Sequence, residues 1–107
     1  MSVGQQTLIL VQQAAAKRML VTPHALSQMS RPDRMITSLE LNQVIQTGTV
    51  IEDYPTDPRG HSCLVLGRGN QNRPIHVVCA PKPDFLAIIT AYLPDPGQWS
   101  ADFTTRL

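Results

Sequence analysis

The sequence predicts an α+β domain in which about three N-terminal helices pack on a four-stranded antiparallel sheet. Apolar residues recur at helical spacing before Gly48, and the apolar period changes to two after it. In the second half, short strand-like runs are separated by turns rich in glycine, proline and aspartate. Because the chain has 107 residues and no shift in composition, we predict a single domain over residues 1–107.

The N-terminal half contains three predicted helices. The first spans residues 5–20, where no proline or glycine interrupts the apolar stripe. A short helix follows over 23–30, because proline disfavours helix in the residue before it and suits a first helical turn. The third spans 38–47, since Thr37-Ser38-Leu39-Glu40 matches a capping box and Gly48 supplies the C-terminal stop.

Residues 49–93 are predicted to form the antiparallel sheet as a meander. Its four strands are placed at 49–54, at 62–66, around His76 and around Ile89. The last segment, 94–107, begins with two prolines and is predicted to be a tail. We expect its large apolar residues, Trp99 and Phe103, to dock it on the domain.

Charge and hydropathy limit the possible partners. The formal net charge is +1, so no global field attracts nucleic acid or an anionic membrane, and phosphate binding would have to be local. No apolar run approaches the roughly 20 residues of a membrane-spanning helix, and the N-terminus lacks a signal-peptide pattern. We therefore expect a cytoplasmic protein with no membrane partner. Cys63 and Cys79 are predicted to be buried free thiols, and a disulfide between them is the alternative that the sequence leaves open.

A zinc site can be tested against strand geometry. Soft ligands are offered by His61, Cys63, His76 and Cys79. His76 and Cys79 lie three residues apart on one strand and so point to opposite faces, which leaves at most three convergent ligands. The sequence therefore predicts no metal.

Other cofactor patterns are also weak. Gly67-Arg68-Gly69 indicates a hairpin turn and not a phosphate-binding loop. Glu52 and Asp53 alternate across their strand, so they do not form a convergent pair of carboxylates. We predict no cofactor.

His76 is the most informative titratable residue, because it interrupts an apolar strand. If the following hairpin pairs in the suitable register, His76 lies near Thr90 or Tyr92, which makes a small polar group among apolar residues. The alternative is a histidine that is hydrogen-bonded to a neighbour or faces solvent on the uncovered side of the sheet. The sequence does not fix the register.

His24 starts the short second helix, where free backbone N–H groups favour an anion. The alternative is that His24 orders the preceding turn through a hydrogen bond to the backbone. Candidate phosphate ligands, if folding brings them together, are Arg31, Arg34, Arg73 and Arg106. His61 follows Gly60 in a turn and is expected to be exposed.

Several motifs in order resemble one known family. They run from His24-Ala25 through Val50-Ile51-Glu52-Asp53-Tyr54-Pro55, Leu64-Val65-Leu66-Gly67 and Ile75-His76-Val77-Val78 to Thr90-Ala91-Tyr92-Leu93-Pro94. This order resembles the bacterial domain-of-unknown-function family numbered forty-two fifty-eight, over about residues 22–107. The family is grouped by fold with RelE-like and BrnT-like toxin ribonucleases, which implies helices on an antiparallel sheet. Where that family tends to have arginine, this chain has Gln28.

The resemblance implies a toxin ribonuclease that cleaves RNA without metal, alone or on the ribosome, with an antitoxin as partner. Such cleavage needs a base for the 2′-hydroxyl, an acid for the leaving oxygen and cations for the phosphate. The candidate catalytic residues are His76, His24, Tyr92 and Thr90. The alternative function is a non-enzymatic interaction module that binds a protein partner, or forms a homodimer, through its sheet.

Overall fold

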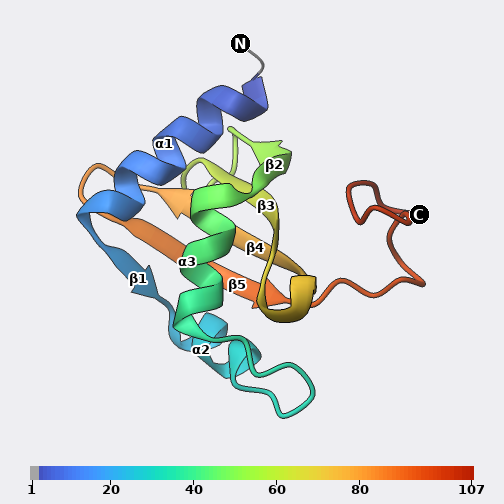
Figure 1. Cartoon of the computed structure of the whole chain (residues 1–107). Helices are drawn as coiled ribbons and strands as arrows, with labels where there is room; N and C mark the ends of the chain where they lie inside the picture. Colours follow the sequence, from blue (N-terminus) through green and yellow to red (C-terminus); the bar gives the residue numbers. More distant parts are fainter. Residues whose placement is uncertain (1–2) are drawn as a thin grey trace.

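The computed structural model describes residues 3–107, which form three helices and one five-stranded sheet (Figure 1). The strand order is β1-β5-β4-β3-β2. The elements are α1 (Val3–Lys17), β1 (Met19–Val21), α2 (Pro23–Met29), α3 (Ser38–Thr47), β2 (Thr49–Tyr54), β3 (Ser62–Arg68), the 3₁₀ turn η1 (Asn70–Asn72), β4 (Pro74–Pro81) and β5 (Leu86–Tyr92). The α+β class is confirmed.

The predicted four-stranded antiparallel sheet is wrong in one respect, because β1 adds a fifth strand. This strand runs parallel to β5, with Met19 opposite Leu86, so the sheet is mixed. The prediction carried the first helix on to residue 20, whereas α1 ends at Lys17. A three-residue apolar run fits a helix as well as a strand, and only the neighbouring β5 decides between them.

The two other helices begin with the caps that the sequence indicates. Thr37 and Glu40 form the predicted capping box of α3. The Thr22 hydroxyl accepts from the backbone N–H of Ala25 at 3.1 Å and caps α2. Both contacts satisfy N–H groups that a helix start leaves without a partner.

The main core lies between the helices and one face of the sheet, which we name the helix face. Figure 1 shows α1 and α3 in front of the sheet. Alternate residues of the central strands point into this core, among them Val65, Ile75 and Val77. Cys63 and Cys79 lie there as buried free thiols, as predicted, with their sulfur atoms 3.8 Å apart.

The opposite face of the sheet, which we name the tail face, is covered in part by the tail, residues 94–107. Trp99 is only 5% exposed and packs against His76. The described tail contains no helix or long strand. It has an isolated bridge between Trp99 and Arg106 and further internal hydrogen bonds, such as that from the Ser100 N–H to the Thr105 carbonyl oxygen at 2.8 Å. The predicted docking of the tail by its apolar residues is confirmed at Trp99.

The helices described over residues 3–107 are all too short or too polar to cross a membrane.

Candidate functional site on the tail face

The hairpin of β4 and β5 places His76 directly opposite Tyr92. This is the register that the sequence left open. The His76 Nδ1 atom lies 3.2 Å from the Tyr92 hydroxyl, and Nε2 lies 2.8 Å from the Phe103 carbonyl oxygen. Because a carbonyl only accepts, Nε2 carries the hydrogen, and Nδ1 accepts from the tyrosine O–H. The two partners therefore fix one neutral tautomer.

His76 is fully buried beneath the tail. Its ring meets the Trp99 ring edge-on, with centroids 4.4 Å apart. Burial lowers the pKa of His76, although the Phe103 carbonyl and Glu52 raise it in part, so the ring is neutral at pH 7. A substrate could touch this ring only if the tail moved, whereas the half-buried Tyr92 reaches from the ring toward the surface.

A second polar group lies on β2 at the same face. Glu52 accepts from the Tyr54 hydroxyl and from Arg106, whose Nε and Nη2 lie 2.9 and 3.1 Å from its two oxygens. Burial raises the pKa of Glu52, but the hydrogen bonds from Arg106 and Tyr54 outweigh it and bring the pKa below its ordinary value. The carboxylate is therefore ionised at neutral pH. The predicted alternation of Glu52 and Asp53 is confirmed, because Asp53 bonds Thr7 of α1 on the helix side.

Perturbed titratable groups gather on the tail face. The pKa of Tyr54 and that of Tyr92 are both raised, mainly by burial, and the hydrogen bonds that Arg106 makes to Glu52 and Tyr54 raise the pKa of Arg106. Together with His76 and Glu52, these groups form one connected cluster, because Glu52 and Arg106 also act on the charge of His76. Such clustering is typical of functional sites.

Aromatic and cationic side chains surround this cluster. Every aromatic residue of the chain except Phe85 lies on the tail face or in the tail. Arg106 stacks over the Trp99 ring at 4.7 Å, and Arg68 stacks over the Phe103 ring at 5.9 Å. Phe103 has a left-handed backbone with φ of 63°, which is uncommon outside glycine. This conformation belongs to the residue whose carbonyl holds His76.

The structure brings three of the predicted site residues to this cluster and one beside it. His76, Tyr92 and Arg106 belong to the cluster itself. Thr90 pairs with Val78 and lies on the same face, two residues before Tyr92. The remaining predicted residues lie elsewhere, on α2 and the loops that follow α2 and β3.

Arg73 has a structural partner. Its Nε and Nη2 donate to the fully buried carboxylate of Glu40 at 2.8 and 2.6 Å, and Nη1 donates to the Arg34 carbonyl at 2.7 Å. The hydrogen bonds from Arg73 lower the pKa of Glu40 to about 2. Most donors of Arg73 are therefore occupied in holding α3 to the turn after β3.

The other predicted cations and His24 are separate from the tail-face cluster. Arg34 lines a cavity of about 310 Å³ together with Arg73 and two side-chain amides. Arg31 is paired with Asp33 at 3.2 Å at the surface. His24 is exposed in the first turn of α2. The structure thus divides the predicted phosphate ligands between two regions.

One polar pair was missed in the sequence. His61 is half-buried, contrary to the prediction, and its Nε2 lies 2.6 Å from Asp53 Oδ1. The other oxygen of Asp53 accepts from the Thr7 hydroxyl at 3.0 Å. Eight residues separate the histidine from the aspartate and a turn joins them, so only the β2–β3 pairing brings them together. Within residues 3–107, no three histidine, cysteine or carboxylate side chains converge as metal ligands.

Comparison with known proteins gives a family but no described function. No curated protein and no solved structure matches the chain. The model of one family matches residues 21–93, which begin at the end of β1 and continue just past β5. The match includes most of the tail-face cluster and excludes the tail. The chain belongs to the family described as a domain of unknown function (DUF4258).

Proposed function

We propose that this chain binds RNA on the tail face and cleaves it without a metal ion. The observation that supports the proposal is the Tyr92–His76 pair, an acid–base couple flanked by Arg106 and by aromatic rings. Aromatic rings and arginine on a sheet face are typical of surfaces that bind single-stranded RNA by stacking and charge. The class of enzyme that we propose is the toxin ribonuclease.

The cleavage step assigns a role to each group. The Tyr92 oxygen takes the proton of the 2′-hydroxyl as its own proton passes to Nδ1 of His76, so His76 acts through Tyr92 as a positioning residue. The 2′-oxygen forms a bond to phosphorus, the bond to the 5′-oxygen breaks, and the 5′-oxygen takes a proton from water. The hydroxide that remains takes back the proton held by His76 through Tyr92, so both side chains return to their starting state. Arg106 stabilises the charge that builds on the phosphate. Because burial lowers the pKa of His76, His76 is a weak acceptor for the Tyr92 proton, and slow turnover is expected.

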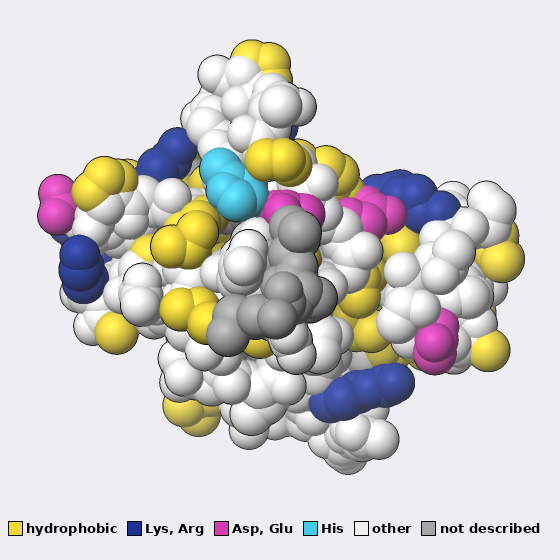
Figure 2. Space-filling view, turned by 90° about the horizontal axis from the view of Figure 1, so that it is seen from above, with side chains coloured by type: hydrophobic (Ala, Val, Ile, Leu, Met, Phe, Trp, Pro, Cys, Tyr) yellow, Lys and Arg dark blue, Asp and Glu magenta, His cyan; other side chains and the backbone are white. Residues whose placement is uncertain are grey.

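Binding is tested by the anisotropy of a labelled single-stranded RNA of about twelve nucleotides. The net charge of +1 predicts modest affinity. Figure 2, which shows the molecule from above, shows basic side chains that are scattered and not gathered in one patch. If Arg68 and Arg106 each neutralise one phosphate, affinity should fall roughly tenfold when salt rises from about 50 to about 250 mM. Arg106→Gln should weaken binding, and Arg59→Gln, which removes an exposed arginine from another loop, should not.

Cleavage is tested with Tyr92→Phe, which removes the hydroxyl and keeps the ring. In the presence of a metal chelator, wild-type protein should cleave RNA, alone or on ribosomes, and Tyr92→Phe should bind equally but cleave at least tenfold more slowly. A ribosomal substrate would place the protein in the cytoplasm, with an antitoxin as the expected partner. Equal cleavage by both proteins, or no cleavage in any condition, would refute the catalytic part.

A different observation favours the second candidate, a non-enzymatic interaction module. Large apolar side chains are exposed near α2 and the start of α3: Leu26 at 58%, Met35 at 61% and Leu39 at 78%. Exposed apolar groups of this size favour a protein partner or a homodimer. We expect the partner to bind this apolar region and not to pair with an edge strand of the sheet. One edge strand, β1, has only three residues, and the other, β2, has an irregular register between Val50 and Glu52. Absence of RNA binding at low salt would favour this candidate.

A further inference from the structure

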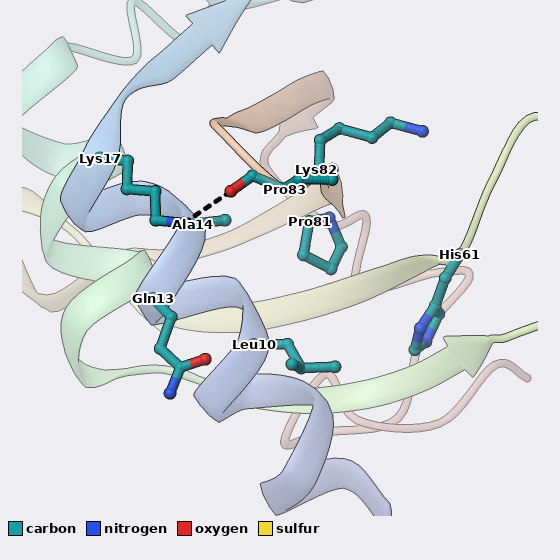
Figure 3. Close-up of a pocket in the computed structure, with 8 residues that line it drawn as sticks. All are labelled: Leu10, Gln13, Ala14, Lys17, His61, Pro81, Lys82 and Pro83. Carbon is teal, nitrogen blue, oxygen red and sulfur yellow. Dashed lines mark hydrogen bonds between the residues drawn. The ribbon is translucent and has the colours of Figure 1, made fainter.

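A groove runs between α1 and the turn that joins β4 to β5, away from the tail-face cluster. Its volume is about 310 Å³, at the lower end for small-molecule sites. Figure 3 shows the lining residues, which come from α1, from the turn and from the loop before β3. They are Leu10, Gln13, Ala14, Lys17, His61, Pro81, Lys82 and Pro83. The three segments meet only in the folded chain.

His61 is held in a fixed orientation at one side of this groove. Its Nε2 bonds Asp53 at 2.6 Å, and Asp53 is held in turn by the Thr7 hydroxyl of α1 at 3.0 Å. The His61 side chain is 29% exposed, so the ring still faces solvent. A carboxylate behind a histidine fixes which ring nitrogen carries the hydrogen, so Nε2 donates to Asp53 and Nδ1 is left as an acceptor at the groove.

Both lysines of the groove are anchored to backbone carbonyls. Lys17 Nζ donates to the Pro83 carbonyl at 2.7 Å, as the dashed line in Figure 3 shows, and Lys82 Nζ donates to the Arg59 carbonyl at 3.1 Å. Each ammonium has three donors, so each keeps two. Gly60, with φ of 111°, allows the approach of Lys82, because a Cβ there would overlap its ammonium.

The lining residues include two lysines and no carboxylate. Gln13 and His61 are the other polar residues of the lining, and its apolar part comes from two prolines, Ala14 and Leu10, which is 47% exposed. Exposure of a leucine beside two prolines leaves apolar area for a ligand to cover. The charge selects an anion, and the apolar wall selects a ligand with a hydrocarbon or ring body.

We propose that this groove binds a small organic anion, in which a carboxylate or phosphate group meets Lys17 and an apolar body lies on Leu10 and Pro81. This site is independent of the proposed RNA surface and shares none of its residues. Either proposal can therefore fail without the other.

The test is a titration of ¹⁵N-labelled protein with phenyl phosphate, followed by backbone and histidine-ring NMR signals. Benzoate is the second probe and separates carboxylate from phosphate recognition, and inorganic phosphate tests the head group alone. Saturable shifts are expected at residues of α1, at His61 and in the turn after β4. Phenyl phosphate should bind at least fivefold more tightly than inorganic phosphate, because only the former covers the apolar wall.

Variants assign the effect to the groove. Lys17→Gln should weaken phenyl phosphate binding at least fivefold, while the remaining NMR signals stay those of the folded protein. Arg18→Gln removes the neighbouring charge, which does not line the groove, and should bind like wild type. Shifts that do not saturate, shifts centred outside the groove, or equal binding by Lys17→Gln and wild type would each overturn the proposal.

Discussion

At the scale of single residues, this domain surrounds its buried polar groups with partners. The Glu40 carboxylate receives two bonds from Arg73 and the backbone N–H groups of Asn70 and Thr37. His76 uses both ring nitrogens. A buried charge or ring nitrogen without a partner would lower the free energy of unfolding by about 1–3 kcal/mol or more. Glu40 and His76 can therefore be buried only because these contacts satisfy them.

Acidification is expected to destabilise the domain through His76. Its pKa in the fold lies below the ordinary 6.5, chiefly because the ring is buried, while Glu52 opposes the shift and Arg106 adds to it. Between the folded pKa and 6.5, the unfolded chain binds more protons than the fold. The contribution of His76 is therefore complete above about pH 6.5 and is lost as the pH falls toward the folded pKa.

Urea unfolding at about pH 7.5, 6.5 and 5.5 measures this effect, since Glu40 and Glu52, whose ordinary pKa is 4.5, act at lower pH. The free energy of unfolding should fall over this range, and the fall should be smaller in His76→Phe. His24→Gln removes an exposed histidine and serves as the control. Equal slopes for wild type and His76→Phe would contradict the assignment.

At the scale of elements, the packing of α3 on β3 depends on two close approaches at glycine. A Cβ at Gly67 would lie 2.8 Å from the Val44 Cα, and one at Gly48 would lie 2.5 Å from the Val44 carbonyl oxygen. Backbone atoms on a packed helix move only with the whole helix. These glycines therefore set how closely α3 lies on the sheet.

Gly67→Ala is expected to destabilise the domain by about 1–3 kcal/mol, because the added methyl group pushes α3 away from β3. Chemical denaturation measures the change. Gly97→Ala is the matched control, since the nearest atom to its Cβ is a side-chain oxygen of Asp95 at 3.3 Å. A Gly67→Ala protein as stable as Gly97→Ala would show that the helix adjusts freely.

At the scale of the whole molecule, the tail completes a second, smaller core. The helix face is covered by three helices, whereas the tail face depends on a segment without regular structure. Trp99, the Phe103 carbonyl and Arg106 hold this segment to β4 and β2. Opening of the tail would expose His76 without unfolding the helix face.

Trp99→Ala is expected to release the tail and to cost about 3 kcal/mol, because a buried ring is removed. Hydrogen exchange should become at least tenfold faster at Phe103 and Leu107, whose amides bond inside the tail, while amides of the central strands stay protected. Leu107→Ala, at an 80% exposed side chain, provides the comparison. Uniform acceleration through the sheet would show instead that the tail and the main core unfold together.

Local patterns in the sequence were enough to predict the α+β class, the capping box at Thr37 and Glu40, the buried free thiols and the docking of Trp99. These features depend on short-range periodicity, on residues three apart in a helix, or on the apolar character of one side chain. The predicted link between His76 and Tyr92 depended on a hairpin register, which the sequence offered as one of two possibilities. The structure selected it.

Tertiary structure alone decided the features that join distant segments. Met19–Val21 is a strand because β5 lies beside it, and Arg73 holds α3 because Glu40, thirty-three residues away, is buried next to it. Likewise, Asp53 orients His61 only once β2 and β3 are paired. Periodicity and propensity are properties of a few neighbouring residues, so they can be read from the sequence. Which distant side chains converge depends on the strand order and register, and these are set by how the entire chain buries its apolar residues.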